Sequence, residues 1–180
     1  NSHYYGLGLT YEIGKLSLAG IVERFDNKSE EDKNKATMVY SLSATYDFEV
    51  AKAFFGYQYA NRFHSLDQLE DVWVSGKGMN QNAFTLGAEV PAAGGTFKVA
   101  ANYGFGKVKS ADGVVVDDTK LSNDKFNRFT VGAAYEYPLS KRTFVYGWGA
   151  YATAGKMFKE KAVEENFKSW SLGLGLHHTF

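Results

Sequence analysis

Apolar and polar residues alternate along most of this chain with a period of two. Between Tyr5 and Glu12, apolar side chains occupy the odd positions, while glycine, threonine or glutamate occupies the even ones. The same alternation returns in five further blocks, at residues 38–47, 84–90, 97–105, 128–137 and 170–180. Successive side chains of a β-strand point to opposite sides, so each block predicts a strand with one apolar face and one small or polar face.

With the less regular blocks included, the sequence predicts nine strands, at residues 3–12, 15–25, 36–48, 51–63, 81–90, 95–107, 126–138, 142–153 and 168–180. Their lengths are those of tilted membrane-spanning strands. Short turns alternate strictly with longer charged connections, which lie at residues 26–35, 64–80, 108–125 and 154–167. Short turns at one rim and long loops at the other are typical of outer-membrane barrels. The expected fold is an all-β, transmembrane, antiparallel up-and-down β-barrel.

The size of the residues on each face bears on whether the barrel is a membrane protein or a soluble one. The polar faces are mostly glycine, serine, threonine and alanine, which suits the lumen of a membrane barrel better than a solvated exterior. The apolar faces carry aromatic residues near the strand ends, such as Tyr5 and Tyr11 or Tyr40 and Tyr46, as membrane interfaces favour. A soluble, lipocalin-like barrel with the apolar face inward is the alternative.

The amino-acid composition argues against two other classes of protein, helical membrane proteins and nucleic-acid-binding proteins. No stretch approaches the roughly 20 apolar residues that a spanning helix needs, whereas 12 Tyr, 14 Phe and 19 Gly in 180 residues suit strands. Lys and Arg together number 20, as do Asp and Glu, so nothing in the charge favours a nucleic-acid partner. The chain is expected to form one domain, residues 1–180.

The number of predicted strands indicates whether they can form a complete barrel. If the turn at 139–141 is periplasmic, the last strand ends in the periplasm and Asn1 lies on the extracellular side. Complete bacterial barrels have an even number of strands. Nine strands therefore predict that the chain is the C-terminal part of a larger barrel.

Two segments near the end of the chain carry specific motifs. Residues 136–146 read EYPLSKRTFVY, and residues 172–180 read LGLGLHHTF. The first resembles the Leu-Ser-Lys-Arg-Thr-x-x-Tyr turn and strand of the general porins of β-proteobacteria. The second resembles the Gly-Leu-Arg-His-x-Phe terminus of the same Gram-negative outer-membrane porin family, and residues 84–91 are a weaker third match.

This resemblance implies a homotrimer of barrels of about 16 strands, each with a water-filled pore for passive diffusion of small hydrophilic solutes and ions. The partners that it implies are the lipid bilayer, lipopolysaccharide, the remaining N-terminal strands and, during biogenesis, the barrel assembly machinery. It also implies that the assembly machinery reads the alternating residues before the terminus, which here are Leu172, Leu174, Leu176, His178 and Phe180. His177 stands where the family often has arginine.

Bond chemistry is not expected. The adjacent pair His177 and His178 lies on one strand, so its two rings point to opposite faces and do not share a metal ion. We expect no catalytic, cofactor-binding or metal site, and no enzyme activity. A structural or adhesive outer-membrane barrel with a plugged lumen is the alternative function.

Charged residues on the lumen side would set which ions pass. The alternation puts both signs on the inner wall in nearly equal number: Lys52, Arg62, Lys98 and Arg128 with Glu12, Asp47, Glu89 and Glu136. This part of the wall therefore predicts weak ion preference. Strand 142–153 is ambiguous: Phe144, Tyr146 and Trp148 are expected to face lipid, but facing inward they would form an aromatic slide.

Overall fold

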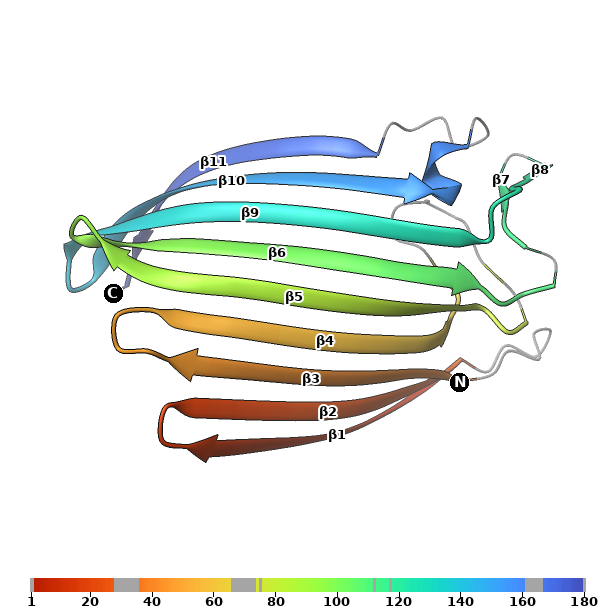
Figure 1. Cartoon of the computed structure of the whole chain (residues 1–180), viewed down its shortest axis with the longest axis horizontal. Helices are drawn as coiled ribbons and strands as arrows, with labels where there is room; N and C mark the ends of the chain where they lie inside the picture. Colours follow the sequence, from red (N-terminus) through yellow and green to blue (C-terminus); the bar gives the residue numbers. More distant parts are fainter. Residues whose placement is uncertain are drawn as a thin grey trace.

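The protein forms one large antiparallel sheet in the computed structural model, which describes residues 2–27, 36–65, 74, 76–111, 113–116, 118–160 and 167–179. Nine long strands lie side by side in chain order (Figure 1). They are β1 (Ser2–Ile13), β2 (Leu16–Asn27), β3 (Thr37–Asp47), β4 (Lys52–Phe63), β5 (Met79–Ala92), β6 (Gly95–Val108), β9 (Lys125–Ser140), β10 (Thr143–Lys156) and β11 (Lys168–His178).

The nine predicted strands are confirmed, with bounds that shift by no more than three residues. The sequence did not indicate a small ribbon of β7 (Val115–Val116) and β8 (Thr119–Lys120), nor the 3-10 turn η1 (Met157–Lys159). No helix among the described residues has the length and apolar character needed to cross a membrane.

The two ends of the sheet differ in their connections (Figure 1). At the turn end, Ile13 pairs with Leu16 and Ala92 with Gly95, so only two residues separate the strands of these hairpins. The strand ends that the longer connections join lie at the other end, here called the loop end. Strand β1 starts at the loop end and β11 finishes at the turn end. The predicted positions of Asn1 and Phe180 fall outside the described residues.

The pairing register sorts the side chains of all nine strands into two faces. The face that holds the leucines of β1, β5 and β11 is here called the apolar face, and the opposite one the polar face. Small and uncharged polar residues form the centre of the polar face: Thr85, Gly87, Ala100, Asn102, Thr130 and Gly132.

The apolar face is unburied across the whole width of the sheet. The exposed fractions are 72% for Leu7, 76% for Leu9, 52% for Leu42, 62% for Leu86 and 91% for Leu174. Burying a leucine side chain away from water is worth about 1.5–3 kcal/mol. A soluble barrel would turn this face inward, so its exposure favours the membrane-protein prediction.

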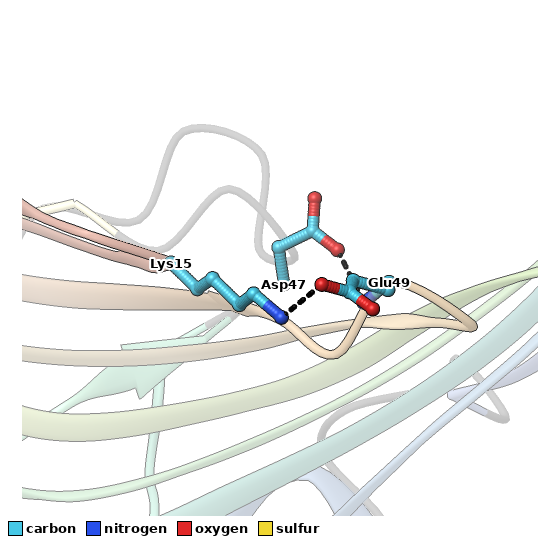
Figure 2. Close-up of polar contacts among 3 residues, drawn as sticks. All are labelled: Lys15, Asp47 and Glu49. Carbon is cyan, nitrogen blue, oxygen red and sulfur yellow. Dashed lines mark hydrogen bonds and ion pairs between the residues drawn. The ribbon is translucent and has the colours of Figure 1, made fainter.

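Polar contacts tie the first two tight turns together at the turn end (Figure 2). The Lys15 ammonium forms an ion pair with the Glu49 carboxylate of the next turn. The Asp47 backbone N–H donates to the Lys15 carbonyl at 2.9 Å. The Asp47 carboxylate in turn accepts from the Glu49 backbone N–H at 2.8 Å. Because Glu49 has a φ of 71°, which L-residues rarely adopt, these contacts hold a strained turn in place.

The β5–β6 turn provides a test of this backbone geometry. Ala93 and Gly94 have φ values of 48° and 80°, and a type I′ turn requires positive φ at both central residues. Asparagine tolerates this conformation better than alanine, for which it costs about 1 kcal/mol. We expect Ala93→Asn to raise the free energy of unfolding by up to about 1 kcal/mol, measured by urea unfolding in lipid vesicles.

Ala92→Asn is the matched control, because Ala92 lies one residue earlier, in β5, and does not have a positive φ. We expect no stabilisation from it. A lower stability of Ala93→Asn than of the parent protein would contradict the turn geometry.

Candidate functional site

Five of the eight residues predicted to lie on the inner wall of a pore come together near the turn end of the polar face. Asp47, Lys52, Glu89 and Lys98 are direct neighbours across β3, β4, β5 and β6. Glu136 of β9 completes this charged row, since its carboxylate lies 2.9 Å from the Lys98 ammonium. That ammonium is also 3.7 Å from Glu89, and the Lys52 ammonium is 3.8 Å from Asp47.

The charged row alternates in sign, with three carboxylates and two ammonium groups, which gives a formal charge of −1. Its side chains are between 32% and 52% exposed, so each ion pair contributes at most about 1 kcal/mol to stability. The row is therefore a solvated strip of paired charges with little net field. The weak ion preference expected from the sequence stays a prediction.

Arg128 and Arg62 lie apart from the charged row. Arg128 is on the polar face opposite Gly104 and Ala154, near the loop end. Arg62 sits at an irregularity, since Asn61 pairs with Asn80 and Phe63 with Met79. Its φ of 60° marks a bulge, and alternation does not define a side for a bulged residue. The pore-lining role of all eight residues stays a prediction. Glu12, also assigned to the wall, is on the polar face opposite Ser17.

The expectation that Phe144, Tyr146 and Trp148 face outward is wrong. Tyr146 pairs with Glu136, and Trp148 with Ala134, which itself pairs with Lys98. The three aromatic residues therefore lie on the polar face, where they form what is here called the aromatic ladder. The Phe144 and Tyr146 ring centroids are 6.1 Å apart.

Glycine placement on β11 explains this orientation. Tyr146 lies opposite Gly175 and Trp148 opposite Gly173. A Cβ on Gly173 would be 2.3 Å from the indole nitrogen of Trp148, so the ring covers the glycine backbone. On the apolar face the sizes are reversed, because Leu172 and Leu174 of β11 lie over Gly149 and Gly147 of β10. The alternation within β10 did not indicate which face its aromatic residues occupy. The glycines Gly173 and Gly175 on the partner strand β11 were the sequence signal for it.

A hollow of about 580 Å³ opens on the polar face beside the charged row. Alanine and glycine residues of β5, β6, β9 and β10 form its floor, and Trp148, Phe54 and Lys98 line its margins. A second hollow, of about 250 Å³, continues toward β2 along Ser41, Ser43 and Gln58. The middle of the polar face is thus recessed between the two ends of the sheet.

An apolar cluster covers the loop end of the polar face. It consists of buried residues from four strands and three connections: Val74, Met79, Val108, Val114, Leu121, Phe126, Ala154, Met157 and Phe158. The buried His64 joins this loop cluster through a 2.7 Å contact between its Nδ1 and the Val74 carbonyl. Sequence alternation did not predict this cluster, because loop residues create most of it.

Glu160 connects two of the long connections beside the loop cluster. Its carboxylate accepts hydrogen bonds from the backbone N–H groups of Ser122 at 2.8 Å and Asn123 at 2.6 Å. The Ser122 bond is the main cause that lowers the pKa of this carboxyl group below its ordinary value. The ionised form therefore holds the connection between β6 and β9 against the end of β10.

The last strand has the face assignment expected of it. Leu172, Leu174, Leu176 and His178 share the apolar face, and Phe180 lies outside the described residues. The role of these residues in assembly stays a prediction.

The rings of the histidine pair point to opposite sides, as expected. His177 stacks on Phe144 on the polar face, with centroids 4.8 Å apart, and His178 contacts Thr143. Within the described part of the chain, no group of three or more histidine or acidic side chains is placed to hold a metal ion.

Comparisons with known proteins agree with this architecture. The profile of a family described as Gram-negative porin matches residues 1–156. An outer membrane porin protein of Bordetella pertussis is 30% identical over 193 aligned positions, which cover 96% of this chain and 45% of that protein. The chain thus spans about half the length of the curated relative that it matches.

Two solved structures share the fold at lower identity. The anion-selective porin from Comamonas acidovorans has a TM-score of 0.63 and 23% identity, with 98% of this chain and 49% of that one covered. A loop-deletion variant of OmpT from Vibrio cholerae has a TM-score of 0.65 and 11% identity, with 98% and 53% covered.

The lowered pKa of Glu160 predicts a pH dependence in the loops. A carboxyl group with a lowered folded-state pKa stabilises the fold above its ordinary pKa, and this contribution disappears as the pH falls through the lowered value. We expect hydrogen-exchange protection of the Ser122 and Asn123 amides, corrected for intrinsic rates, to fall between neutral pH and about pH 3.

Glu160→Gln should show weak protection of these amides at every pH. Glu12→Gln, at the turn end, should behave like the parent protein. Unchanged protection down to about pH 3 in the parent would contradict this role of Glu160.

Proposed function

Because the chain belongs to the Gram-negative porin family, we propose that its polar face lines a water-filled channel through which small hydrophilic solutes and ions diffuse passively. The family consists of outer-membrane channel proteins, so the chain is part of an outer-membrane β-barrel and not of an enzyme.

One observation carries the proposal: the same nine strands present a mainly apolar face on one side and a recessed face of small and paired charged residues on the other. The apolar face suits contact with lipid hydrocarbon, which offers no hydrogen bonds. The polar face suits water, since glycine, alanine, serine and threonine leave room for it. A sheet with this division is the wall of an aqueous channel.

The wall is incomplete within the described residues, because β1 pairs only with β2 and β11 only with β10. Unpaired strand edges are not tolerated in a bilayer. We propose that further strands, from the same polypeptide or another, pair with both edges and complete a barrel of about 16 strands. This chain would then form the C-terminal part of one barrel domain.

The partners follow from the same division of faces and remain proposals. The apolar face would contact the lipid bilayer and, in a homotrimer, neighbouring barrels. Lys107 and Lys125, paired with each other at the loop end of the apolar face, would lie near the phosphates of lipopolysaccharide. The apolar face of β11 would be presented to the barrel assembly machinery.

The loop cluster favours a second candidate, a structural or adhesive barrel with a plugged lumen. Its buried residues cover the loop end of the polar face and so narrow the passage there. The recessed centre of that face favours the open channel. Conductance separates the two candidates.

The proposal predicts stepwise increases in ion current when the assembled barrel that contains this chain is added to a planar lipid bilayer. Each step corresponds to one inserted unit, and its size should rise with salt concentration as for a water-filled pore. Insertion without current, with the protein detected in the membrane, would contradict the channel and support the plugged barrel.

The charged row predicts a specific change in ion selectivity. Lys98→Gln removes one ammonium group and changes the formal charge of the row from −1 to −2. We expect the cation-to-anion permeability ratio, measured from the reversal potential in a KCl gradient, to rise about twofold to threefold. Lys168→Gln, on the apolar face, is the control and should leave the ratio unchanged. An unchanged ratio in Lys98→Gln would contradict a pore-lining role.

A further inference from the structure

We propose that the larger hollow of the polar face is a binding site for neutral, hydroxylated ring solutes of the monosaccharide type, with Trp148 as the stacking platform. This inference rests on the proposed function, because solutes reach the polar face only if it lines a channel. It adds a specific binding site to a channel that would otherwise select solutes only by their size.

The floor of the hollow is flat and made of residues with little or no side chain. Gly87, Ala100, Gly132 and Ala150 are direct neighbours across four strands, and Ala134 lies beside them in the next row. With strands about 4.8 Å apart, such a floor extends roughly 14 Å across the sheet. The hollow of about 580 Å³ is within the range of small-molecule sites.

Aromatic residues stand at both ends of this floor. Phe54 is the cross-strand neighbour of Gly87 on one side, and Trp148 is the neighbour of Ala134 on the other. Both line the hollow, whose floor between them is made of small residues. Aromatic rings at such positions offer flat apolar surface to a solute.

The orientation of Trp148 is fixed in advance. Its indole covers Gly173 so closely that a Cβ there would be 2.3 Å from the ring nitrogen, while 41% of the residue remains exposed. A ring that is held against a glycine backbone loses little conformational freedom when a solute stacks on it.

The sides of the hollow are polar and supply hydrogen bonds. On the side toward the loop end, the Asn102 side-chain amide donates to the Thr85 hydroxyl at 2.8 Å, and Thr130 adjoins Asn102 on β9. The Asn102 carbonyl and the Thr130 hydroxyl can meet the hydroxyl groups of a solute. On the other side, Lys98 lies between Glu89 and Glu136.

This arrangement selects a neutral solute. The Lys98 ammonium lies between two carboxylates, so each charged group beside the hollow already has a partner of opposite sign and the net charge there is small. A pyranose ring matches the remaining features, because it has an apolar face of C–H groups for Trp148 and a rim of hydroxyls for the polar sides. An acyclic polyol has the hydroxyls but no ring face.

Single-channel recording of the assembled barrel tests the proposal with methyl β-glucopyranoside as the probe. We expect the sugar to add current noise that saturates with concentration, while sorbitol, of similar size but without a ring, adds none beyond its effect on viscosity. Trp148→Ala should raise the half-saturating concentration about tenfold, by loss of stacking.

Three variants make the test specific. Trp148→Phe should retain most of the affinity. Gly173→Ala should weaken binding although Trp148 is present, because the added methyl group displaces the indole. Trp170→Ala removes a tryptophan from the apolar face of β11 and should leave the sugar effect unchanged.

Equal half-saturation in the parent protein and in Trp148→Ala, or an equal effect of sorbitol, would overturn the site. If Trp148→Ala does not insert, the comparison of Trp148→Phe and Gly173→Ala decides in the same way. The absence of ion current from the parent protein without sugar would instead overturn the proposed channel. The two failures are therefore distinguishable.

Discussion

Backbone pairing is the constraint on which the rest of the structure depends. The long strands bond to their neighbours through antiparallel registers that run nearly their whole length, so the polar backbone groups of the sheet interior are satisfied without water. Only then can an apolar face remain against lipid. The same registers decide which side chains share a face, and so they bring Asp47, Lys52, Glu89 and Lys98 into one row from four strands.

Once the register is set, side-chain size on one strand determines what the next strand can carry. Trp148 and Tyr146 lie on the polar face because Gly173 and Gly175 leave space for them. The leucines of β11 fill the opposite face over Gly147 and Gly149. The strands β10 and β11 are thus complementary in side-chain size: on each face, the large residues of one strand lie over the glycines of the other. At the loop end, where pairing stops, apolar loop residues pack together instead and cover the polar face.

Strands, connections and most of the charged row could be predicted from the sequence, because alternation is a local signal that a sheet of this kind preserves. The predictions were weak where the orientation of a residue depended on the side chains of a neighbouring strand. Both faces of β10 carry uncharged residues from Thr143 to Gly155, so its orientation followed from the register with β9 and β11 rather than from its own pattern. Arg62 fell at a bulge, where alternation is interrupted. The loop cluster and the Glu160 hydrogen bonds join residues far apart in the chain, which no local period encodes.

The central claim is that one face of the sheet meets water within the membrane and the other meets lipid. The chain has no cysteine, so single cysteines along β5 test the claim directly with a membrane-impermeant thiol reagent. Substitutions at Ala83, Thr85 and Gly87 are predicted to react and to reduce the ion current of the assembled barrel. Those at Phe84, Leu86 and Ala88 are predicted to do neither. Uniform reactivity, or the reverse alternation, would contradict the assignment of the two faces.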